Sequence, residues 1–336
     1  MHRHEVIVIT GASAGVGRAT ARAFAAQGAS VALLARGRDG LAAAAAEVRS
    51  LGGTALAIPV DVSDATAVEA AAEKIEEELG PIDVWVNNAM TAILAPVAET
   101  SADDFRRVTE VTYLGCVHGT LSALRRMKAR DRGTIVQVGS ALAHRAIPLQ
   151  ASYCGAKHAM RGFTESLRCE LLHDKSNVKV TMVQLAGLNT PQFGWVKTTL
   201  RRHPQPVPPI YQPEVAARAI VWAAHHPRRE YYVGAPTPVT IWAGRLAPAL
   251  VDRYLAATNI DAQQTDTAIG ANRANYLDEP LDDASGSDRG AHGIFGDQAH
   301  PRSLLFDIDR RRHHLLGAAA MAATLTAAQR VLRAGS

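Results

Sequence analysis

The alternation of two kinds of segment constrains the fold of this chain more than any other feature. Over about the first 235 residues, short runs rich in Val, Ile and Leu alternate with longer alanine-rich stretches that have helical periodicity. Such short runs, apolar at nearly every position, are typical of strands that are buried on both faces of a parallel sheet. The sequence therefore predicts an α/β fold: a doubly wound parallel sheet of about seven strands, with helices on both faces and a C-terminal extension.

The same pattern bounds the individual elements. The expected strands are Val6–Thr10, Ser30–Ala35, Thr54–Pro59, Asp83–Asn87, Gly133–Gly139, Val178–Gln184 and Tyr231–Val233. The expected helices are Ala14–Gly28, Gly40–Leu51, Ala65–Leu79, Ala102–Arg130, Tyr153–His173 and Pro213–His225. Sheets of this kind bind ligands at the carboxyl ends of their strands, so functional residues are expected just after each strand.

The pattern changes after about residue 235, where a further helix is expected over Thr237–Ile260. We divide the chain into a domain of residues 1–258, a flexible low-complexity segment of residues 259–302 and a helical tail of residues 303–336. The middle segment is rich in Asp, Gly, Ser, Gln and Asn, a composition that buries little apolar surface.

The tail contains an uncharged run of 14 residues, Leu315–Ala328, which is shorter than the roughly 18 residues of a membrane span. Peripheral membrane contact through this run is an alternative. We favour a helix packed on the body or on a partner subunit, because its Gly and Ala residues give a weak apolar face.

Composition excludes several other classes of protein. A chain of 336 residues with 47% hydrophobic and 20% charged residues is neither disordered throughout nor collagen-like. The three cysteines (Cys116, Cys154 and Cys169) lack a CxxC spacing, which suggests neither a disulfide framework nor a zinc site. We expect a cytoplasmic protein, since the chain starts without a secretory signal. No metal is expected, and a net charge of +4 gives no reason to expect a nucleic-acid partner.

The first expected strand leads into a glycine-rich turn that opens the first helix. The turn has the sequence Thr10–Gly17, whose cofactor-binding candidates are Thr10, Gly11, Ser13, Gly15, Val16 and Gly17. Glycines let a backbone turn tightly and approach a pyrophosphate, whose charge is favoured at a helix N-terminus. We interpret this turn as a dinucleotide cradle; the alternative is a tight turn without a ligand.

The end of the second strand bears on which dinucleotide binds. A carboxylate here binds the adenosine ribose 2′-hydroxyl of NAD, whereas an arginine suits the 2′-phosphate of NADP. This chain has Ala35 and Arg36 at that point, and Arg38 could share or take the role. NADP(H) is therefore preferred, with NAD(H) as the alternative.

These motifs and their spacing resemble those of the short-chain dehydrogenase/reductase family, over residues 5 to about 235. The glycine turn matches the family's Thr-Gly-x-x-x-Gly-x-Gly, and Tyr153 to Lys157 matches its Tyr-x-x-x-Lys. The resemblance implies a Rossmann-like fold and a homodimer or homotetramer built on the long helices. It further implies adenine contacts from Asp61 and Val62, and cofactor contacts from Asn88, Ala89, Tyr153, Lys157, Gly187 and Thr190.

The residue types suit carbonyl reduction, which needs a hydride on carbon and a proton on oxygen. The cofactor brings the hydride, and Tyr153 is the candidate general acid or base. Lys157 lies one helical turn further on, and a nearby cation is expected to lower the pKa of the tyrosine. Ser140, 13 residues before Tyr153, would stabilise charge on the substrate oxygen. The alternative is a surface Tyr–Lys pair beside an ordinary strand-end serine.

Several positions depart from the family pattern. Met90 replaces the glycine of the family's Asn-Asn-Ala-Gly motif, which is otherwise present as Asn87–Ala89. Thr112 stands where many members carry an asparagine that relays protons, and threonine is shorter with one polar atom. Ala186 stands for a proline, and the stretch from Gly187 to Thr190 is one residue shorter than usual. Thr112 stays a catalytic candidate, with an altered relay.

The substrate side is expected to be apolar. Leu142 and Ile147 lie between Ser140 and Tyr153, while Phe193 and Trp195 begin an expected lid over about residues 190–213. The predicted function is an NADP-dependent carbonyl reductase or alcohol dehydrogenase acting on a fairly apolar ketone or secondary alcohol. The alternative is an NADP(H)-binding sensor or scaffold without turnover.

Overall fold

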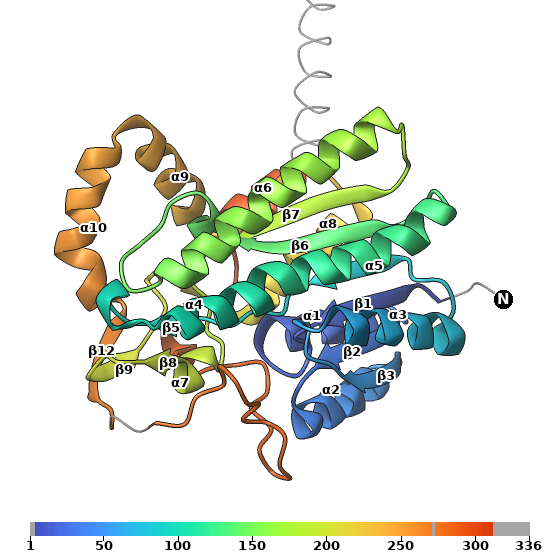
Figure 1. Cartoon of the computed structure of the whole chain (residues 1–336), viewed down its shortest axis with the longest axis horizontal. Helices are drawn as coiled ribbons and strands as arrows, with labels where there is room; N and C mark the ends of the chain where they lie inside the picture. The colour runs from blue at the N-terminus through green and yellow to red at the C-terminus, as the bar shows by residue number, and fades with distance from the viewer. Residues whose placement is uncertain (1–3, 271–272, 312–336) are drawn as a thin grey trace, which may run out of the picture.

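A seven-stranded parallel sheet forms the centre of the molecule in the computed structural model, which describes residues 4–270 and 273–311 (Figure 1). Its strand order is β11-β7-β6-β4-β1-β2-β3, and every neighbouring pair is parallel. The strands are β1 (Val6–Thr10), β2 (Ser30–Ala35), β3 (Thr54–Pro59), β4 (Val84–Asn87), β6 (Thr134–Ser140), β7 (Lys179–Leu185) and β11 (Glu230–Tyr232). The predicted α/β fold with a parallel sheet is confirmed, and most strand ends differ from the prediction by no more than one residue.

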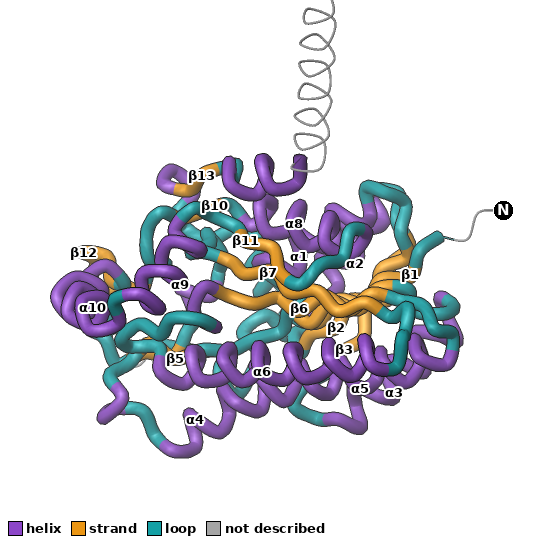
Figure 2. The backbone as a smooth tube through the Cα atoms, turned by 90° about the horizontal axis from the view of Figure 1, so that it is seen from above, coloured by secondary structure: helices purple, strands orange, loops and turns teal. Residues whose placement is uncertain are grey.

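Helices cover both faces of this sheet (Figure 2). On one face lie α1 (Gly15–Ala25), α2 (Arg38–Ser50) and α8 (Pro213–His225); on the other lie α3 (Ala65–Leu79), α5 (Gly115–Ala129) and α6 (Ala151–His173). Successive side chains of a strand point to opposite faces, so Ile7 and Ile9 join one core cluster and Val6 and Val8 join the other. This two-sided burial explains why the strands are apolar throughout.

The expected helix Ala102–Arg130 is divided in the structure. It consists of α4 (Ala102–Thr109), a π-helical turn over Glu110–Leu114, and α5. Thr112 lies in that turn, and its hydroxyl donates to the Thr91 carbonyl at 2.9 Å and accepts the Thr91 N–H at 3.0 Å. Single π turns inside helices are often found at functional sites.

The expected helix Thr237–Ile260 is also two helices, α9 (Pro236–Leu246) and α10 (Pro248–Ala262). Pro248 separates them because proline has no N–H to continue a helix and clashes with the preceding turn, so it is found at the first position of a new one.

The short elements that remain are β5 (Ile93–Leu94), α7 (Gln192–Trp195), β8 (Lys197–Thr198), β9 (Arg202–Pro204), β10 (Ile210–Tyr211), β12 (Gln264–Ala268), β13 (Ala299–His300) and 3-10 turns at Val97–Glu99, Ala141–Ala143 and Gly296–Gln298.

Residues 259–302, expected to be flexible with little burial, differ most from the prediction. Strand β12 pairs with β9 and β13 pairs with β10, and the side chains of Tyr276, Leu277 and Phe295 are buried against the body. The prediction used the average composition of the segment, which does not register a few large apolar side chains. These three side chains are buried in the structure. We call residues 273–290 the C-terminal strap; it runs along the carboxyl ends of the strands (Figure 1, orange).

Part of the tail is described. Residues 304–311 are helical, and the Phe306 ring is buried against Tyr231 of β11. The rest of the expected helical tail, including the run Leu315–Ala328, lies outside the described residues. None of the described helices combines the length and the apolarity needed to cross a membrane.

Candidate active site

A cavity of about 510 Å³ lies at the carboxyl ends of the central strands. It collects most of the residues singled out in the sequence: Gly11, Ser13, Gly15, Val16, Arg36, Asp61, Val62, Asn88, Ala89, Ser140, Leu142, Ile147, Tyr153, Lys157, Gly187, Thr190, Phe193 and Trp195. Three candidates, Thr10, Gly17 and Thr112, are not among its lining residues. They lie behind the lining, where they hold the loops that form it.

The glycine turn is shaped by two of its glycines. Gly11 has a φ of +65°, in the left-handed region that favours glycine. A Cβ on Gly17 would lie 2.1 Å from the Gly11 carbonyl oxygen, so any side chain there would push the turn apart. Asn88, directly after β4, fixes the same turn, since its Nδ2 donates to the carbonyls of Thr10 at 2.9 Å and Gly11 at 3.1 Å.

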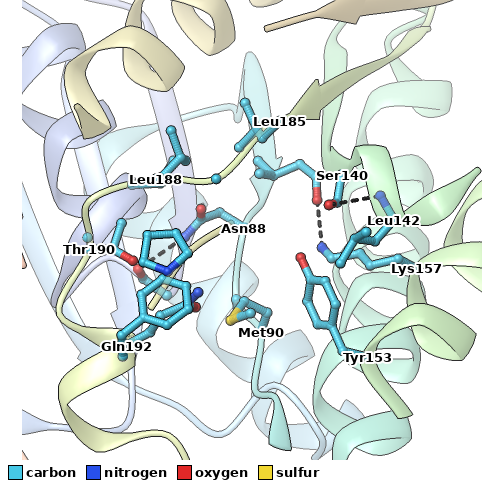
Figure 3. A pocket seen from close by; sticks show the side chains of 18 of the residues that line it. Asn88, Met90, Ser140, Leu142, Tyr153, Lys157, Leu185, Leu188, Thr190 and Gln192 are labelled. Carbon is cyan, nitrogen blue, oxygen red and sulfur yellow. Dashed lines mark hydrogen bonds between the residues drawn. The ribbon is translucent and has the colours of Figure 1, made fainter. Parts of the chain in front are cut away.

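Ser140, Tyr153 and Lys157 meet in one wall of the cavity (Figure 3). Ser140 ends β6, while Tyr153 and Lys157 project from neighbouring turns of α6. The Lys157 ammonium donates to the Val138 carbonyl at 2.7 Å and lies 5.6 Å from the centre of the Tyr153 ring. The Ser140 hydroxyl accepts the N–H of Leu142 at 3.1 Å, so the serine side chain is held in place by the turn that follows its strand.

Burial dominates the electrostatics of this trio. It lowers the pKa of Lys157 from its usual value to about 8. It raises the pKa of Tyr153 above its usual value, an effect partly offset by a hydrogen bond from the Ser140 side chain. The pKa of Tyr153 is thus raised overall, opposite to the lowering expected from the sequence, because desolvation outweighs the groups that favour the phenolate. Tyr153 is a protonated phenol at neutral pH, the form that can donate a proton.

The predicted adenine contacts, Asp61 and Val62, both line the cavity. Asp61 Oδ1 accepts the Ser63 N–H at 3.0 Å, and Asp61 Oδ2 lies 2.5 Å from Nη2 of Arg107 on α4. Burial alone would raise the pKa of Asp61, but the hydrogen bonds from Arg107 and Ser63 lower it below its usual range. Arg107 was missed in the sequence, where nothing sets it apart from other helical arginines.

Arg36, expected to face an NADP 2′-phosphate, is bonded to the C-terminal strap. Its Nη1 donates to the carbonyls of Leu277 at 3.3 Å and Asp278 at 2.6 Å, and its Nη2 donates to the carbonyl of Tyr276 at 2.5 Å. The strap and α10 contribute lining residues that sequence reasoning missed, namely Tyr254, Leu255, Asn259, Tyr276, Pro280, Leu281 and Asp282. The signal that could have found the strap is its apolar trio Tyr276, Leu277 and Leu281 within a polar stretch.

The end of the cavity near Tyr153 is largely apolar. Trp195 stacks obliquely on Tyr276 with ring centroids 5.6 Å apart, and Phe193 meets Phe295 edge to face at 6.1 Å. Leu142, Ile147 and the prolines of 206–209 complete this end. The aromatic residues of the expected lid thus line the cavity and also pack against the C-terminal segment.

Comparison with known proteins agrees with this architecture. A family model described as short chain dehydrogenase matches residues 5–199. The uncharacterized oxidoreductase YxnA of Bacillus subtilis is 34% identical over 255 residues, which cover 75% of this chain and 72% of that protein. The chain belongs to the short chain dehydrogenase family, and it is an NAD(P)-dependent oxidoreductase of that family.

Two solved structures share the fold. An alcohol dehydrogenase from Thermococcus sibiricus, complexed with 5-hydroxy-NADP, superposes with a TM-score of 0.59 and 29% identity, covering 68% of this chain and 95% of that one. A short chain dehydrogenase/reductase from Burkholderia phymatum, in complex with NAD, has a TM-score of 0.65 and 24% identity, covering 76% and 97%. At that identity the second structure supports the fold alone. The matched family region, residues 5–199, ends before the C-terminal strap.

Proposed function

We propose that this chain is a carbonyl reductase or alcohol dehydrogenase that transfers a hydride between a nicotinamide cofactor and a fairly apolar ketone or secondary alcohol. The observation that carries the proposal is the placement of Ser140, Tyr153 and Lys157 in one wall of the cavity that the glycine turn also lines. The apolar end formed by Leu142, Ile147, Phe193 and Trp195 supports the substrate class.

The residues present fit a dinucleotide. The turn Gly11–Val16 would hold the pyrophosphate, Asp61 and Val62 would border the adenine, and Gly187 and Thr190 would lie at the nicotinamide end. When bound, the cofactor supplies or accepts the hydride. Tyr153 donates the proton to the carbonyl oxygen, and Ser140 donates a hydrogen bond to the same oxygen as charge develops on it. Lys157 stabilises negative charge on the tyrosine oxygen after the proton leaves.

The preference for NADP over NAD stays a prediction that rests on Arg36 and Arg38. Arg38 is exposed beside Asp283, and Arg36 is bonded to strap carbonyls. Neither arginine therefore argues strongly for a 2′-phosphate in this fold. The Thermococcus sibiricus alcohol dehydrogenase, complexed with 5-hydroxy-NADP, supports a nicotinamide cofactor for this chain.

A sensor that binds the cofactor without turnover is the second candidate. One observation favours it. The Thr112 hydroxyl forms both of its hydrogen bonds with the Thr91 backbone and is not among the lining residues of the cavity. A proton relay through this position would therefore lack the Thr112 hydroxyl. The protonated Tyr153 beside Ser140 favours the enzyme.

The variant Tyr153→Phe separates these two functions. Under the enzyme proposal, turnover of a series of apolar ketones falls at least about a hundredfold, because the proton donor is lost, while cofactor affinity stays within about twofold. Steady-state kinetics and a fluorescence titration of the nicotinamide measure the two quantities. Equal turnover by Tyr153→Phe and the native chain would exclude the mechanism, and cofactor binding with no turnover by either would favour the sensor.

We further propose that the chain forms a homodimer or homotetramer through α5 and α6. The exposed Leu121 and Leu172 on these helices support an apolar contact there. Light scattering on the purified chain tests this: the variant Leu121→Glu should lower the mass of the particle, and a native chain that is monomeric at all concentrations excludes it.

A further inference from the structure

A buried carboxylate reaches the adenosine end of the cavity from the C-terminal strap. Asp282 is only 5% exposed and lines the cavity next to the carboxyl end of β2. Its Oδ2 atom makes no full hydrogen bond in the part of the chain that the structure describes, and the Ser13 side chain is the polar group beside the carboxylate. A buried carboxylate oxygen without a partner is costly, so its presence beside a ligand cavity points to a partner that arrives with the ligand.

The end of β2 and the first turn of α2 leave space for this side chain. A Cβ on Gly37 would lie 1.9 Å from Asp282 Oδ1, and a Cβ on Gly40 would lie 2.2 Å from Asp282 Oδ2. Only glycine at both positions leaves room for the carboxylate. The backbone is tied as well, because the Gly40 N–H donates to the Asp282 carbonyl at 3.1 Å.

Two further contacts hold the strap at this place. Arg18, which is 3% exposed on α1, pairs with Asp288 at 2.5 Å, and the Gly15 N–H donates to the Gly290 carbonyl at 3.1 Å. Arg36 is held by three strap carbonyls. Asp282 is thus fixed by contacts on both sides of it in the sequence.

The position of Asp282 determines which group on the adenosine ribose a dinucleotide site can accept. Its carboxylate lies between Ser13 of the glycine turn and the N-terminus of α2, where the adenosine ribose of a dinucleotide comes to lie. A carboxylate there accepts a hydrogen bond from a ribose 2′-hydroxyl. A 2′-phosphate at the same point would place about two negative charges against a buried carboxylate, which is strongly repulsive in a partly desolvated site.

We propose that Asp282 is a specificity-determining residue, which binds the adenosine ribose 2′-hydroxyl and makes the site prefer NAD(H) to NADP(H). The carboxylate that discriminates would come from the C-terminal strap, whereas β2 ends in Ala35 and Arg36. The inference rests on the proposed nicotinamide site, and it reverses the preference that Arg36 suggests in the sequence.

Binding of adenosine fragments to the full-length chain tests the proposal without any turnover. Adenosine 5′-monophosphate carries the free 2′-hydroxyl, and adenosine 2′,5′-bisphosphate carries the 2′-phosphate; NADH and NADPH are titrated beside them by calorimetry. The native chain should bind the members with a free 2′-hydroxyl at least about tenfold more tightly. In Asp282→Asn, the 2′-phosphate ligands should bind about tenfold more tightly than in the native chain, and the preference should largely disappear.

Asp278→Asn is the matched control, because it removes the same charge from an exposed strap residue four positions earlier. It should retain the native preference. A native chain that prefers the 2′-phosphate ligands overturns the proposal, whatever the variants do. An equal gain for all ligands in Asp282→Asn also overturns it, since the strap would then be a cover that ligands displace.

The outcome is separable from that of the proposed function. If the chain binds adenosine 5′-monophosphate more tightly than adenosine 2′,5′-bisphosphate but transfers no hydride, the result supports the role of Asp282 and counts against the proposed enzymatic function. Failure of all four ligands to bind contradicts both.

Discussion

At the residue scale, the energetics of the site come from burying polar groups rather than from pairing charges. Lys157 is 2% exposed with one carbonyl partner at 2.7 Å, and Tyr153 is surrounded by apolar side chains. Both pKa shifts disfavour the charged form of the group. The pH dependence of the proposed reaction rate is therefore set by the neutral phenol of Tyr153 and by the loss of the Lys157 proton.

Carbonyl reduction should slow as the pH rises through about 8, because Lys157 loses its proton there. The unfolded lysine holds its proton to about 10.5, so between these values the unfolded state binds more protons, and the penalty that burying this group places on the folded state falls as the pH rises. The loss of rate is therefore not unfolding by this group. Initial rates at saturating cofactor from pH 6 to 10, beside thermal melts, measure both. A flat rate up to pH 10 contradicts this role of Lys157.

The variant Gly17→Ala should lower the free energy of unfolding by about 2 kcal/mol or more, because its Cβ would overlap the Gly11 carbonyl oxygen. Cofactor affinity should fall with it. The control is Gly162→Ala in α6, where a new Cβ meets nothing within 4 Å; it should stabilise the chain by about 0.5–1 kcal/mol. Urea unfolding measures both values, and equal effects of the two substitutions would show that the glycine turn tolerates a side chain.

At the element scale, the C-terminal strap shows how a polar segment can be ordered by a few side chains. Tyr276 is its main apolar anchor, packed on Trp195, and its hydroxyl accepts the Ala92 N–H at 3.2 Å. Carbonyls of neighbouring strap residues are satisfied by Arg36, and Leu277 also accepts from Arg107 at 3.2 Å. Most of the strap's remaining residues are left exposed, which is why its composition resembles that of a flexible linker.

Replacing Tyr276 with alanine should release the strap. The expected cost is about 3 kcal/mol of unfolding free energy, together with faster proteolytic cleavage within residues 273–290. The control is Leu250→Ala on α10, which removes a side chain that is 64% exposed and should change neither quantity appreciably. Mass spectrometry of the first cleavage products locates the cut. An unchanged cleavage pattern in Tyr276→Ala means that other contacts hold the strap.

At the scale of the whole molecule, the described residues between 259 and 311 are part of the core rather than an appendage. Phe295 packs on Phe193, and Phe306 packs on Tyr231 at the edge of the sheet. Helix α10 and the strap also form one side of the cavity. The domain boundary at residue 258 expected from composition therefore passes through the structural unit.

A chain cut after residue 258 should be markedly less stable than the full chain, since it exposes Phe193 and Trp195 and loses the buried Tyr276 and Phe306. Its midpoint of urea unfolding should fall and its binding of hydrophobic dye should rise. Identical unfolding curves for the two chains would show that residues 259–336 do not stabilise the domain and form a separate extension.

The family resemblance implied that Ser140 acts with Tyr153 and Lys157. The sequence by itself determined the parallel sheet, the glycine turn and the pairing of Tyr153 with Lys157. These follow from local rules: burial on both faces of a strand, backbone freedom at glycine, and helical spacing of four residues. Only the tertiary structure decided what surrounds Arg36, because its partner Leu277 lies 241 residues further along the chain. The same holds for Asp282, whose place depends on two glycines after β2 and on ties far apart in sequence. Contacts at such separations depend on how the whole chain closes, and no local pattern encodes them.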